Sequence, residues 1–536
     1  MSSLATSYKR SGNNDDYDAI VIGSGIGGLT TAALLSRLAG LRVLVLERHY
    51  EPGGFTHTFK RPRFEWDVGV HYIGSTHPKT LLGKVLGLIT DGTLEWADMG
   101  DVYDRLIFGK DVYDLPRGKK ALILSLKERF PDDHDAIDKY FELLQQALQS
   151  SGLHFLEKAL PPALADLIGP KMTAQFNVLA GKTTREVLEG ITKNERLIAV
   201  LTGQWGDYGL PPSKSSFAIQ AMVASHYFNG AFYPVGGSGR IAESIVPAIE
   251  EGGGRVLIRA EVDQILIEDK RAVGVRMSDG STIMAPIVIS DAGVFNTFNR
   301  LLNPQTARQF GVDKIGTKIE PSAAHICLYM GLENTAEELG LKKPNLWVYP
   351  DDRLEANLAA ANADPKSKMP VVYLSFPSAK DPDFENRFPG RSTIEAITIM
   401  PYSWVKKWEG TEWKRRSKDY EAFKEEMAQR LMEVLFEQHP QLRGKITHYE
   451  LSTPLTTQHF AGYQHGEIYG IDHTPERFKM RALRPQTPIA GLYLTGQDIA
   501  TCGVAGGLFG GVLCAASVLQ KKPNLLMRVA AYFLGS

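Results

Sequence analysis

The stretch AIVIGSGIGGLTTAALLSRLAGLRVLVLE, residues 19–47, decides the fold of this 536-residue chain. It opens with four apolar residues, a run too short for a helix and typical of a buried parallel strand. Gly23, Gly25 and Gly28 then form the pattern G-x-G-x-x-G, and apolar residues at helical spacing follow. A second apolar run ends at Glu47. Strand, glycine turn, helix and strand in this order predict the first unit of a Rossmann-type α/β fold.

The glycines of this unit indicate what it binds. They permit a tight turn, a close approach of the backbone to a pyrophosphate, and close packing of helix on strand. The phosphates would lie at the helix N-terminus, where free N–H groups and the helix dipole favour anions. Glu47 comes 24 residues after Gly23, where a carboxylate can accept a hydrogen bond from a ribose 2′-OH. The stretch therefore predicts a dinucleotide site, and no second such unit occurs in the chain.

The residues that follow carry a resemblance to a known family. The segment ERHYEPGGFTHTFKRPRFEWDVGVHYIG, residues 47–74, resembles the flavin-containing amine oxidase and phytoene desaturase superfamily in its Pro-Gly-Gly and D-x-G-x-H elements. Residues 209–245 and 453–478 resemble the retinol saturase and carotenoid isomerase branch. This resemblance extends over nearly the whole chain and implies that the cofactor is FAD.

The resemblance also implies a set of site residues. The expected cofactor-binding residues are Gly23, Ser24, Gly25, Gly27, Gly28, Glu47, Arg48, Gly53, Gly54, Val262, Gly496, Asp498, Val504 and Gly506. His71 and Tyr72 are the expected catalytic residues, because their motif passes near the flavin in that superfamily. A structural histidine that only makes hydrogen bonds remains the alternative for His71. No metal site is expected, since no group of His, Cys, Asp or Glu shows ligand spacing.

Near the C-terminus, GQDIATCGVAGGLFGGVLCAASVL, residues 496–519, allows two interpretations. It carries no charge from Cys502 onward, and about 18 such residues meet the minimum length of a membrane-spanning helix. Its glycines recur four apart, which suits helix pairing in membranes. The resemblance implies instead a helix packed beneath the flavin ring, with Val504 to Gly507 closest. We expect the buried cofactor helix and no membrane span.

The order of these segments predicts a discontinuous fold. We expect an FAD-binding domain assembled from residues 15–78, 232–295 and 486–520, with a three-stranded meander in its second part. The intervening residues 79–231 and 296–485 are expected to form an α+β substrate-binding domain, mostly helical in its first part. Residues 521–536 are expected to form an amphipathic tail, because their apolar residues recur at helical spacing.

Composition limits the partners of the chain. The net charge of −1 gives no reason to expect nucleic acid. Three widely spaced cysteines indicate a reducing compartment. The N-terminal residues contain no apolar signal region, so we expect a cytoplasmic protein. Three tryptophans among Lys and Arg in residues 404–420, together with the tail, indicate contact with a membrane surface, although packing of these tryptophans on the protein is the alternative.

The leading interpretation is an FAD-dependent oxidoreductase that acts on a C=C bond of a lipophilic polyene by flavin N5 hydride transfer. The resemblance leaves saturation, desaturation and isomerisation open, as well as the electron donor or acceptor. A flavin amine oxidase and a desaturase of fatty-acyl chains are alternative enzymes. A non-enzymatic protein like the Rab GDP-dissociation inhibitors is disfavoured, because this chain keeps Gly28, Glu47 and Asp498.

Overall fold

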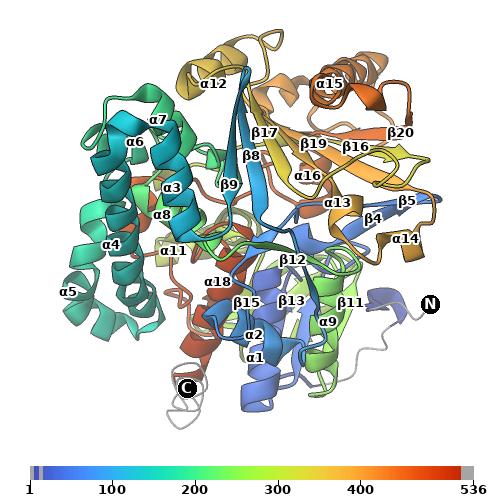
Figure 1. The fold of residues 1–536 in the computed structure, drawn as a ribbon. Helices are drawn as coiled ribbons and strands as arrows, with labels where there is room; N and C mark the ends of the chain where they lie inside the picture. The colour runs from blue at the N-terminus through green and yellow to red at the C-terminus, as the bar shows by residue number, and fades with distance from the viewer. Residues whose placement is uncertain (1–4, 11–15, 521–536) are drawn as a thin grey trace.

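The computed structural model describes residues 5–10 and 16–520, and its centre is a sheet of six parallel strands (Figure 1). The strand order is β1-β11-β3-β2-β15-β21, and every neighbouring pair is parallel. The strands are β1 (Thr6–Ser7), β2 (Ala19–Ile22), β3 (Val43–Leu46), β11 (Arg255–Ile258), β15 (Val288–Ser290) and β21 (Leu492–Leu494). The predicted Rossmann-type α/β class is confirmed.

The two faces of this sheet follow from the alternation of side chains along each strand. Val21 and Val45 point to one face, where they pack with the helices α1 (Ile26–Ala39), α9 (Arg240–Glu250) and α18 (Gly503–Leu519). Ile20 and Leu44 point to the other face, against a three-stranded antiparallel sheet. This second sheet is the predicted meander, with strands β12 (Val262–Glu268), β13 (Arg271–Met277) and β14 (Thr282–Met284).

The contact between α1 and α18 is made by backbone. A Cβ atom on Gly27 of α1 would lie 2.3 Å from Gly496 Cα, and one on Gly511 of α18 would lie 2.7 Å from Gly27 O. A Cβ atom on Gly510 would lie 2.1 Å from Gly496 O. The hydroxyl of Thr31 on α1 also reaches α18, because it lies 3.3 Å from the carbonyl oxygen of Gly511. The glycines of α18 therefore serve close packing against α1 and the turn after β21.

The apolar character of α18 thus has a structural cause inside the protein. Its buried residues include Leu508, Cys514 and Val518, which pack in the same core as α1 and α9. Among the residues that the structure describes, no helix combines the length and apolarity needed to cross a membrane. The expected buried helix is found.

A second large sheet of seven strands lies above the first (Figure 1). Its order is β20-β16-β19-β18-β17-β8-β9, with only β8 and β17 parallel among neighbours. The strands are β8 (Val102–Phe108), β9 (Asp111–Pro116), β16 (His325–Leu332), β17 (Asn345–Tyr349), β18 (Val372–Ser375), β19 (Ser392–Ile399) and β20 (Ile446–Ser452). Helix α15 (Lys418–Gln438) covers one face through Leu431 and Leu435, which pack with Leu328 and Ala396.

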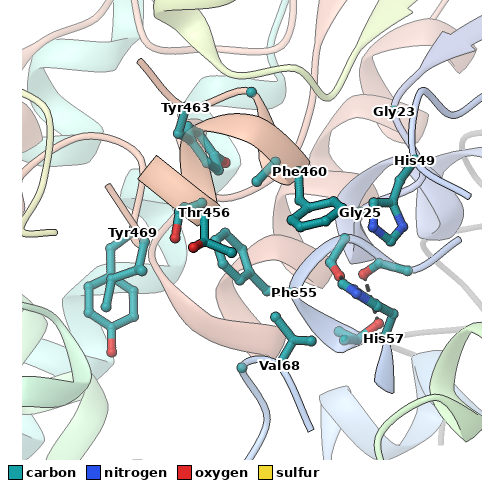
Figure 2. Close-up of a pocket in the computed structure, with 18 of the residues that line it drawn as sticks. Gly23, Gly25, His49, Phe55, His57, Val68, Thr456, Phe460, Tyr463 and Tyr469 are labelled. Atoms are coloured by element: carbon teal, nitrogen blue, oxygen red, sulfur yellow. Dashed lines mark hydrogen bonds between the residues drawn. The ribbon is translucent and has the colours of Figure 1, made fainter. Parts of the chain in front are cut away.

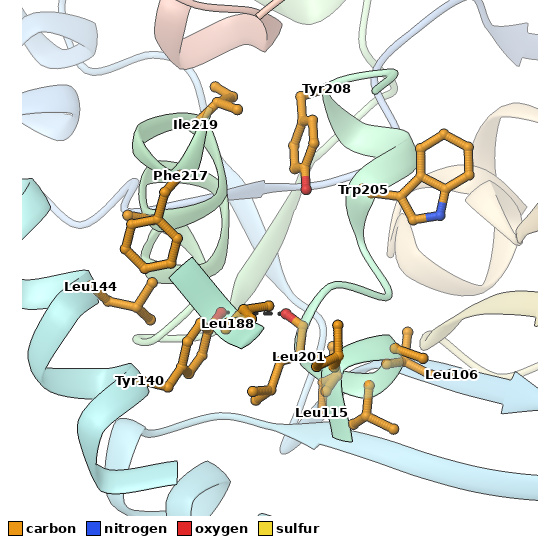
Figure 3. Close-up of a cluster of buried hydrophobic side chains, with 14 of the residues drawn as sticks. Leu106, Leu115, Tyr140, Leu144, Leu188, Leu201, Trp205, Tyr208, Phe217 and Ile219 are labelled. Atoms are coloured by element: carbon orange, nitrogen blue, oxygen red, sulfur yellow. Dashed lines mark hydrogen bonds between the residues drawn. The ribbon is translucent and has the colours of Figure 1, made fainter. Parts of the chain in front are cut away.

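Residues 79–231 are mainly helical, as predicted, although they also contribute β8 and β9 to the seven-stranded sheet. They form α2 (Leu81–Ile89), α3 (Lys119–Arg129), α4 (His134–Ala159), α5 (Pro162–Ala180), α6 (Thr184–Glu189), α7 (Glu195–Leu201) and α8 (Phe217–His226). Figure 3 shows their core, in which Tyr140 and Phe217 lie near Leu188 and Leu201. The core continues to Leu106 of β8, which joins these helices to the seven-stranded sheet.

The glycine contact predicts an effect on stability. Gly27→Ala should lower the free energy of unfolding by about 1–3 kcal/mol, because the new methyl group would overlap backbone that cannot move aside. Gly87→Ala is the matched control: Gly87 is an exposed residue inside α2, and a Cβ atom there meets nothing within 4 Å. That variant should gain about 0.5–1 kcal/mol. Urea unfolding measures both, and equal stabilities of the two variants would contradict the packing argument.

Candidate functional site

A cavity of about 540 Å³ extends from the glycine turns of the six-stranded sheet to the underside of the seven-stranded sheet. Figure 2 shows part of its wall, with Gly23 and Gly25 on one side and Tyr463 and Tyr469 on the other. This volume lies within the range of about 300–1,000 Å³ that is typical of ligand sites. The cavity therefore has a nucleotide end at the glycine turns and a second end at the sheet.

The nucleotide end presents an ordered carboxylate. Glu47 directly follows β3 and is held by three donors: the N–H of Ser24 at 2.8 Å, the hydroxyl of Ser24 at 2.6 Å and the N–H of His49 at 2.7 Å. The Ser24 hydroxyl also accepts from the N–H of Gly53 at 3.1 Å. Glu47 lines the cavity, and its remaining lone pairs are free to accept hydrogen bonds from a ligand.

Asp291, directly after β15, lies where two glycine turns converge. A Cβ atom on Gly25 would lie 2.5 Å from Asp291 Oδ2, and one on Gly496 would lie 2.2 Å from Asp291 Oδ1. Burial raises the pKa of Asp291 to about 8, although hydrogen bonds from the N–H groups of Gly28 and Gly25 oppose the rise. At neutral pH this acid is therefore protonated, and it faces the N-terminus of α1.

Most of the residues expected to bind a cofactor line this cavity. They are Gly23, Gly25, Gly27, Glu47, Arg48, Gly53, Gly54, Val262, Gly496, Asp498 and Val504. Three further expected residues, Ser24, Gly28 and Gly506, are not among the residues that line it. Ser24 is fully buried and holds Glu47, whereas Gly28 and Gly506 pack against the backbone oxygens of Gly23 and Thr501.

Asp498 also makes hydrogen bonds with the protein. Its Oδ2 accepts from the N–H of Val294 at 2.8 Å, and its Oδ1 accepts from the N–H of Ile471 at 3.1 Å. Burial raises the pKa of Asp498, and the nearby Arg477 guanidinium opposes the rise. Its side chain therefore joins the turn after β21 to the chain after β15 and to the segment that precedes α17 (Pro475–Lys479).

The two expected catalytic residues have different positions. His71 lines the cavity, and its Nδ1 lies 2.9 Å from Glu395 Oε2. Burial lowers the pKa of His71 to about 3 and raises that of Glu395 to about 8, so the ring is neutral at neutral pH. Tyr72 does not line the cavity. Its hydroxyl lies 2.8 Å from Asp104 Oδ2 and 2.9 Å from Asp207 Oδ2.

The far end of the cavity is apolar and aromatic. Its wall at the seven-stranded sheet includes Tyr329, Trp347, Val371, Tyr373, Ile397, Ile399 and Leu451. Tyr463 and Tyr469 line the cavity, whereas the His459 ring stacks on Trp413 at 5.3 Å and the His226 ring accepts from the N–H of Gly74.

The tryptophan cluster of residues 404–420 does not form one exposed surface. Trp408 is buried, packs beside Tyr420 at 5.2 Å between ring centroids, and donates its N–H to Asp419 at 2.9 Å. Trp413 and Lys414 instead line the cavity, with the Lys414 ammonium 4.6 Å from the Trp413 ring centroid. The alternative of packing on the protein therefore holds for Trp408.

Two acids of the site were missed in the sequence. Asp291 follows a buried strand in the segment IVISDAG. Ligands of open parallel sheets bind at the carboxyl ends of the strands, and this rule could have identified Asp291. Asp207 lies in the short 3-10 helix Trp205–Asp207 and also lines the cavity. The segment WGDYG around Asp207 carries no recognisable motif, so its significance depends on partners distant in the sequence.

Comparisons with known proteins agree with this geometry. Residues 21–86 match the family described as NAD(P)-binding Rossmann-like domain. All-trans-retinol 13,14-reductase of Danio rerio is 37% identical over 531 residues, which cover 95% of this chain and 87% of that protein. Prolycopene isomerase 1 of an Oncidium hybrid cultivar is 26% identical over 541 residues, which cover 97% of this chain and 88% of the isomerase. Among solved structures, cyclohexylamine oxidase from Brevibacterium oxydans superposes on this chain with a TM-score of 0.60 at 17% identity. The superposition covers 97% of this chain and 99% of the oxidase chain. This similarity concerns the fold alone.

The buried acid at the glycine turns predicts a pH dependence of stability. The Asp291 carboxyl has a pKa of about 8 when folded and about 4 in an unfolded chain, so folding takes up a proton between these values. The stability that this proton provides is complete below about pH 4 and is lost as the pH rises to about 8. Asp291→Asn removes this loss, on the order of a few kcal/mol, without changing the shape of the side chain.

Urea unfolding between about pH 5 and 8 measures this effect. The free energy of unfolding should fall less steeply for Asp291→Asn than for the wild type, whereas Asp132→Asn, at an exposed position, should follow the wild type. Parallel curves for Asp291→Asn and the wild type would contradict the burial of a protonated acid.

Proposed function

The chain belongs to the all-trans-retinol 13,14-reductase family, and we propose on this basis that it is an FAD-dependent oxidoreductase that saturates a C=C bond of a lipophilic polyene. The observation that best supports this function is the cavity, which joins a dinucleotide-type glycine turn at one end to an apolar, aromatic chamber at the other. Saturation is favoured over isomerisation because the reductases are more similar to this chain than the prolycopene isomerases, at 37% against 26% identity.

The residues at the nucleotide end fit FAD. Gly25 and Gly27 leave the N-terminus of α1 without side chains, which a pyrophosphate requires. Glu47 would accept from the ribose, and the backbone of Val262 would face the adenine. Asp498 and the N-terminus of α18 at Val504 would contact the part of the cofactor nearer the flavin ring. We propose that the segments 15–78, 232–295 and 486–520 act together as this FAD-binding domain.

When bound, a flavin exchanges two electrons together with a hydrogen. The protein has to hold the polyene beside it and exclude water. The wall at the seven-stranded sheet suits this task, because Trp347, Ile397 and Ile399 offer apolar surface to an apolar substrate. The neutral His71 adds no charge to that surface. The residues 79–231 and 296–485, which form this sheet and the adjoining helices, are proposed as the substrate-binding part.

A flavin amine oxidase is the second candidate, and one observation favours it. The rings of Phe55 and Tyr463 both line the cavity and lie parallel, at 14° with centroids 6.0 Å apart. Aromatic faces attract ammonium groups, so such a pair could guide an amine. The family of the chain and the apolar far wall favour the polyene instead.

The experiment that tests the proposal offers both substrate classes. The purified protein should be yellow, with the absorbance of bound flavin. After anaerobic reduction, it should convert all-trans-retinol to a product heavier by two hydrogens in the mass spectrum, and the flavin should return to its oxidised spectrum. Oxidation of an aliphatic amine by the oxidised protein, with no conversion of the polyene, would establish the amine oxidase. A colourless protein that takes up no added FAD would overturn both.

A cofactor variant sharpens this experiment. Glu47→Gln should weaken FAD binding by about 1.5–3 kcal/mol, the scale of a hydrogen bond to a charged group. Glu261→Gln is the matched control, because Glu261 also lines the cavity but pairs with Arg300 at 3.0 Å near the surface. Flavin titration separates the two, and equal affinities would show that another residue holds the adenosine end.

We also propose that the protein binds a membrane surface, from which an apolar substrate could enter. The structure offers an apolar patch at the α4–α5 turn, made of Leu153, Leu156, Leu164, Leu167 and Ile168, which are between 38% and 79% exposed. On each helix these residues are spaced by three or four and share one face. Gln520, the last residue described, donates to the carbonyl of Ala159 beside this patch. The expected amphipathic tail, residues 521–536, lies outside the described residues.

Flotation with liposomes tests the membrane proposal. Replacing Leu167 and Ile168 by Ser should reduce the bound fraction at every salt concentration, because apolar burial is not screened by salt. Leu124→Ser is the control, since Leu124 is 68% exposed on α3, outside the patch. An equal loss in both variants would refute the patch, and no flotation of the wild type would refute membrane binding.

A further inference from the structure

Two carboxyl groups meet at one hydroxyl beside the cavity. The Tyr72 hydroxyl lies 2.8 Å from Asp104 Oδ2 and 2.9 Å from Asp207 Oδ2. A tyrosine hydroxyl has one hydrogen to donate, and two ionised carboxylates could only accept it. One of the two acids must therefore carry a proton and donate it to the tyrosine oxygen, so that the chain of hydrogen bonds runs from acid to tyrosine to carboxylate.

The neighbours of the two acids decide which one is protonated. Asp104 is fully buried and accepts from three N–H groups besides the tyrosine: Asn345 Nδ2 at 2.9 Å, Gln204 Nε2 at 2.8 Å and Trp347 Nε1 at 3.1 Å. Several donors stabilise a carboxylate. The proton of the pair therefore lies on Asp207.

The electrostatics agree with this assignment. Burial raises the pKa of Asp207 to about 8 and that of Asp104 to about 6. The titratable groups that face Asp207 are Asp104, Cys502 and a set of tyrosines. The charge of Asp104 adds to the rise of the Asp207 pKa, and the hydrogen bonds that Asp207 shares with Tyr72 and Tyr227 oppose it. None of these neighbours carries a positive charge that would favour ionisation of Asp207.

The position of Asp207 connects the proton to the cavity. Asp207 and Gly206 line the cavity beside Trp347 and Tyr373, whereas Asp104 and Tyr72 do not. The carbonyl of Asp207 accepts from the Sγ of Cys502 at 3.5 Å. Cys502 is the residue before α18, the helix whose N-terminus lines the nucleotide end. The acid is thus fixed at the junction between the two ends of the cavity.

We propose that Asp207 is the catalytic acid that protonates the substrate carbon, with Tyr72 and Asp104 as positioning residues. The inference rests on the proposed function. Saturation of a C=C bond adds two electrons and two hydrogens. A reduced flavin, when bound, would supply both electrons with one hydrogen to one carbon, and the electron pair of the broken π bond would then be left on the neighbouring carbon of the polyene, where Asp207 provides the proton. The Asp207 O–H bond breaks, a C–H bond forms there, and the resulting carboxylate takes a proton from water.

Asp207→Asn tests the role of this proton, because the amide keeps the shape of the acid and a donor toward Tyr72. The variant should bind FAD as the wild type does but saturate all-trans-retinol about 10²- to 10⁴-fold more slowly. The wild-type rate should fall as the pH rises through about 8, where Asp207 ionises. The control is Glu467→Gln, another buried acid, with a pKa raised by burial to about 7, that does not line the cavity; its rate should match the wild type.

Infrared spectra of the flavin-loaded protein give a readout that is independent of turnover. Asp291 and Glu395 are protonated in both proteins and contribute their C=O bands to both spectra. The wild type should show one further C=O band of a protonated carboxylic acid that shifts in D₂O, and Asp207→Asn should lack this band. Tyr72→Phe should shift the band and the alkaline limb of the pH profile while KM stays unchanged. An Asp207→Asn variant that saturates the polyene at the wild-type rate, or that keeps the band, would overturn the assignment. A flavin-loaded wild type that converts no polyene would overturn the proposed function itself.

Discussion

The close approach of α1 and α18 is the constraint on which the rest of this structure depends. Gly27 and Gly511 place two helix backbones in contact, and Gly510 places the second helix against the turn after β21. A Cβ atom does not fit at any of these three glycines. Because of this, the N-termini of both helices reach the same edge of the six-stranded sheet, and both line one cavity. Two helix N-termini and their dipoles thus converge on one cavity, where they favour an anionic ligand.

The sequence predicted the parts of the fold whose signals are local. The unit from β2 to β3, the meander and the helix α18 are recognisable from apolar runs and glycines that lie close together in the chain. The seven-stranded sheet was only partly predicted, because its order depends on pairings such as that of β8 with β17, which join residues more than 200 positions apart. Trp408 also differed from the expected exposed cluster, since its neighbour Tyr420 is set by the start of α15.

The candidate site likewise contains residues that the sequence could identify and residues that only the folded structure reveals. The glycine turns and Glu47 could be named from spacing, because a dinucleotide imposes a fixed pattern on a short segment. Ser24 looked like a contact residue, but its hydroxyl reaches Glu47, and only the folded turn reveals that geometry. Asp207 gave no signal in the sequence, because its property comes from Tyr72 and Asp104, each more than 100 residues away.

Buried acids give this cavity an unusual combination of properties. Asp207 and Asp291 line it, and burial raises the pKa of each to about 8, so at neutral pH both are protonated and neither adds a charge to the wall. A neutral wall does not repel an apolar substrate, and a protonated acid within it is still a proton source. Charged groups at the same positions would favour water in the cavity and would make polyene binding costly. The burial that lowers acidity and the apolar lining therefore serve the same reaction, and the contact of Asp207 with Cys502 ties this acid to the helix that shapes the nucleotide end.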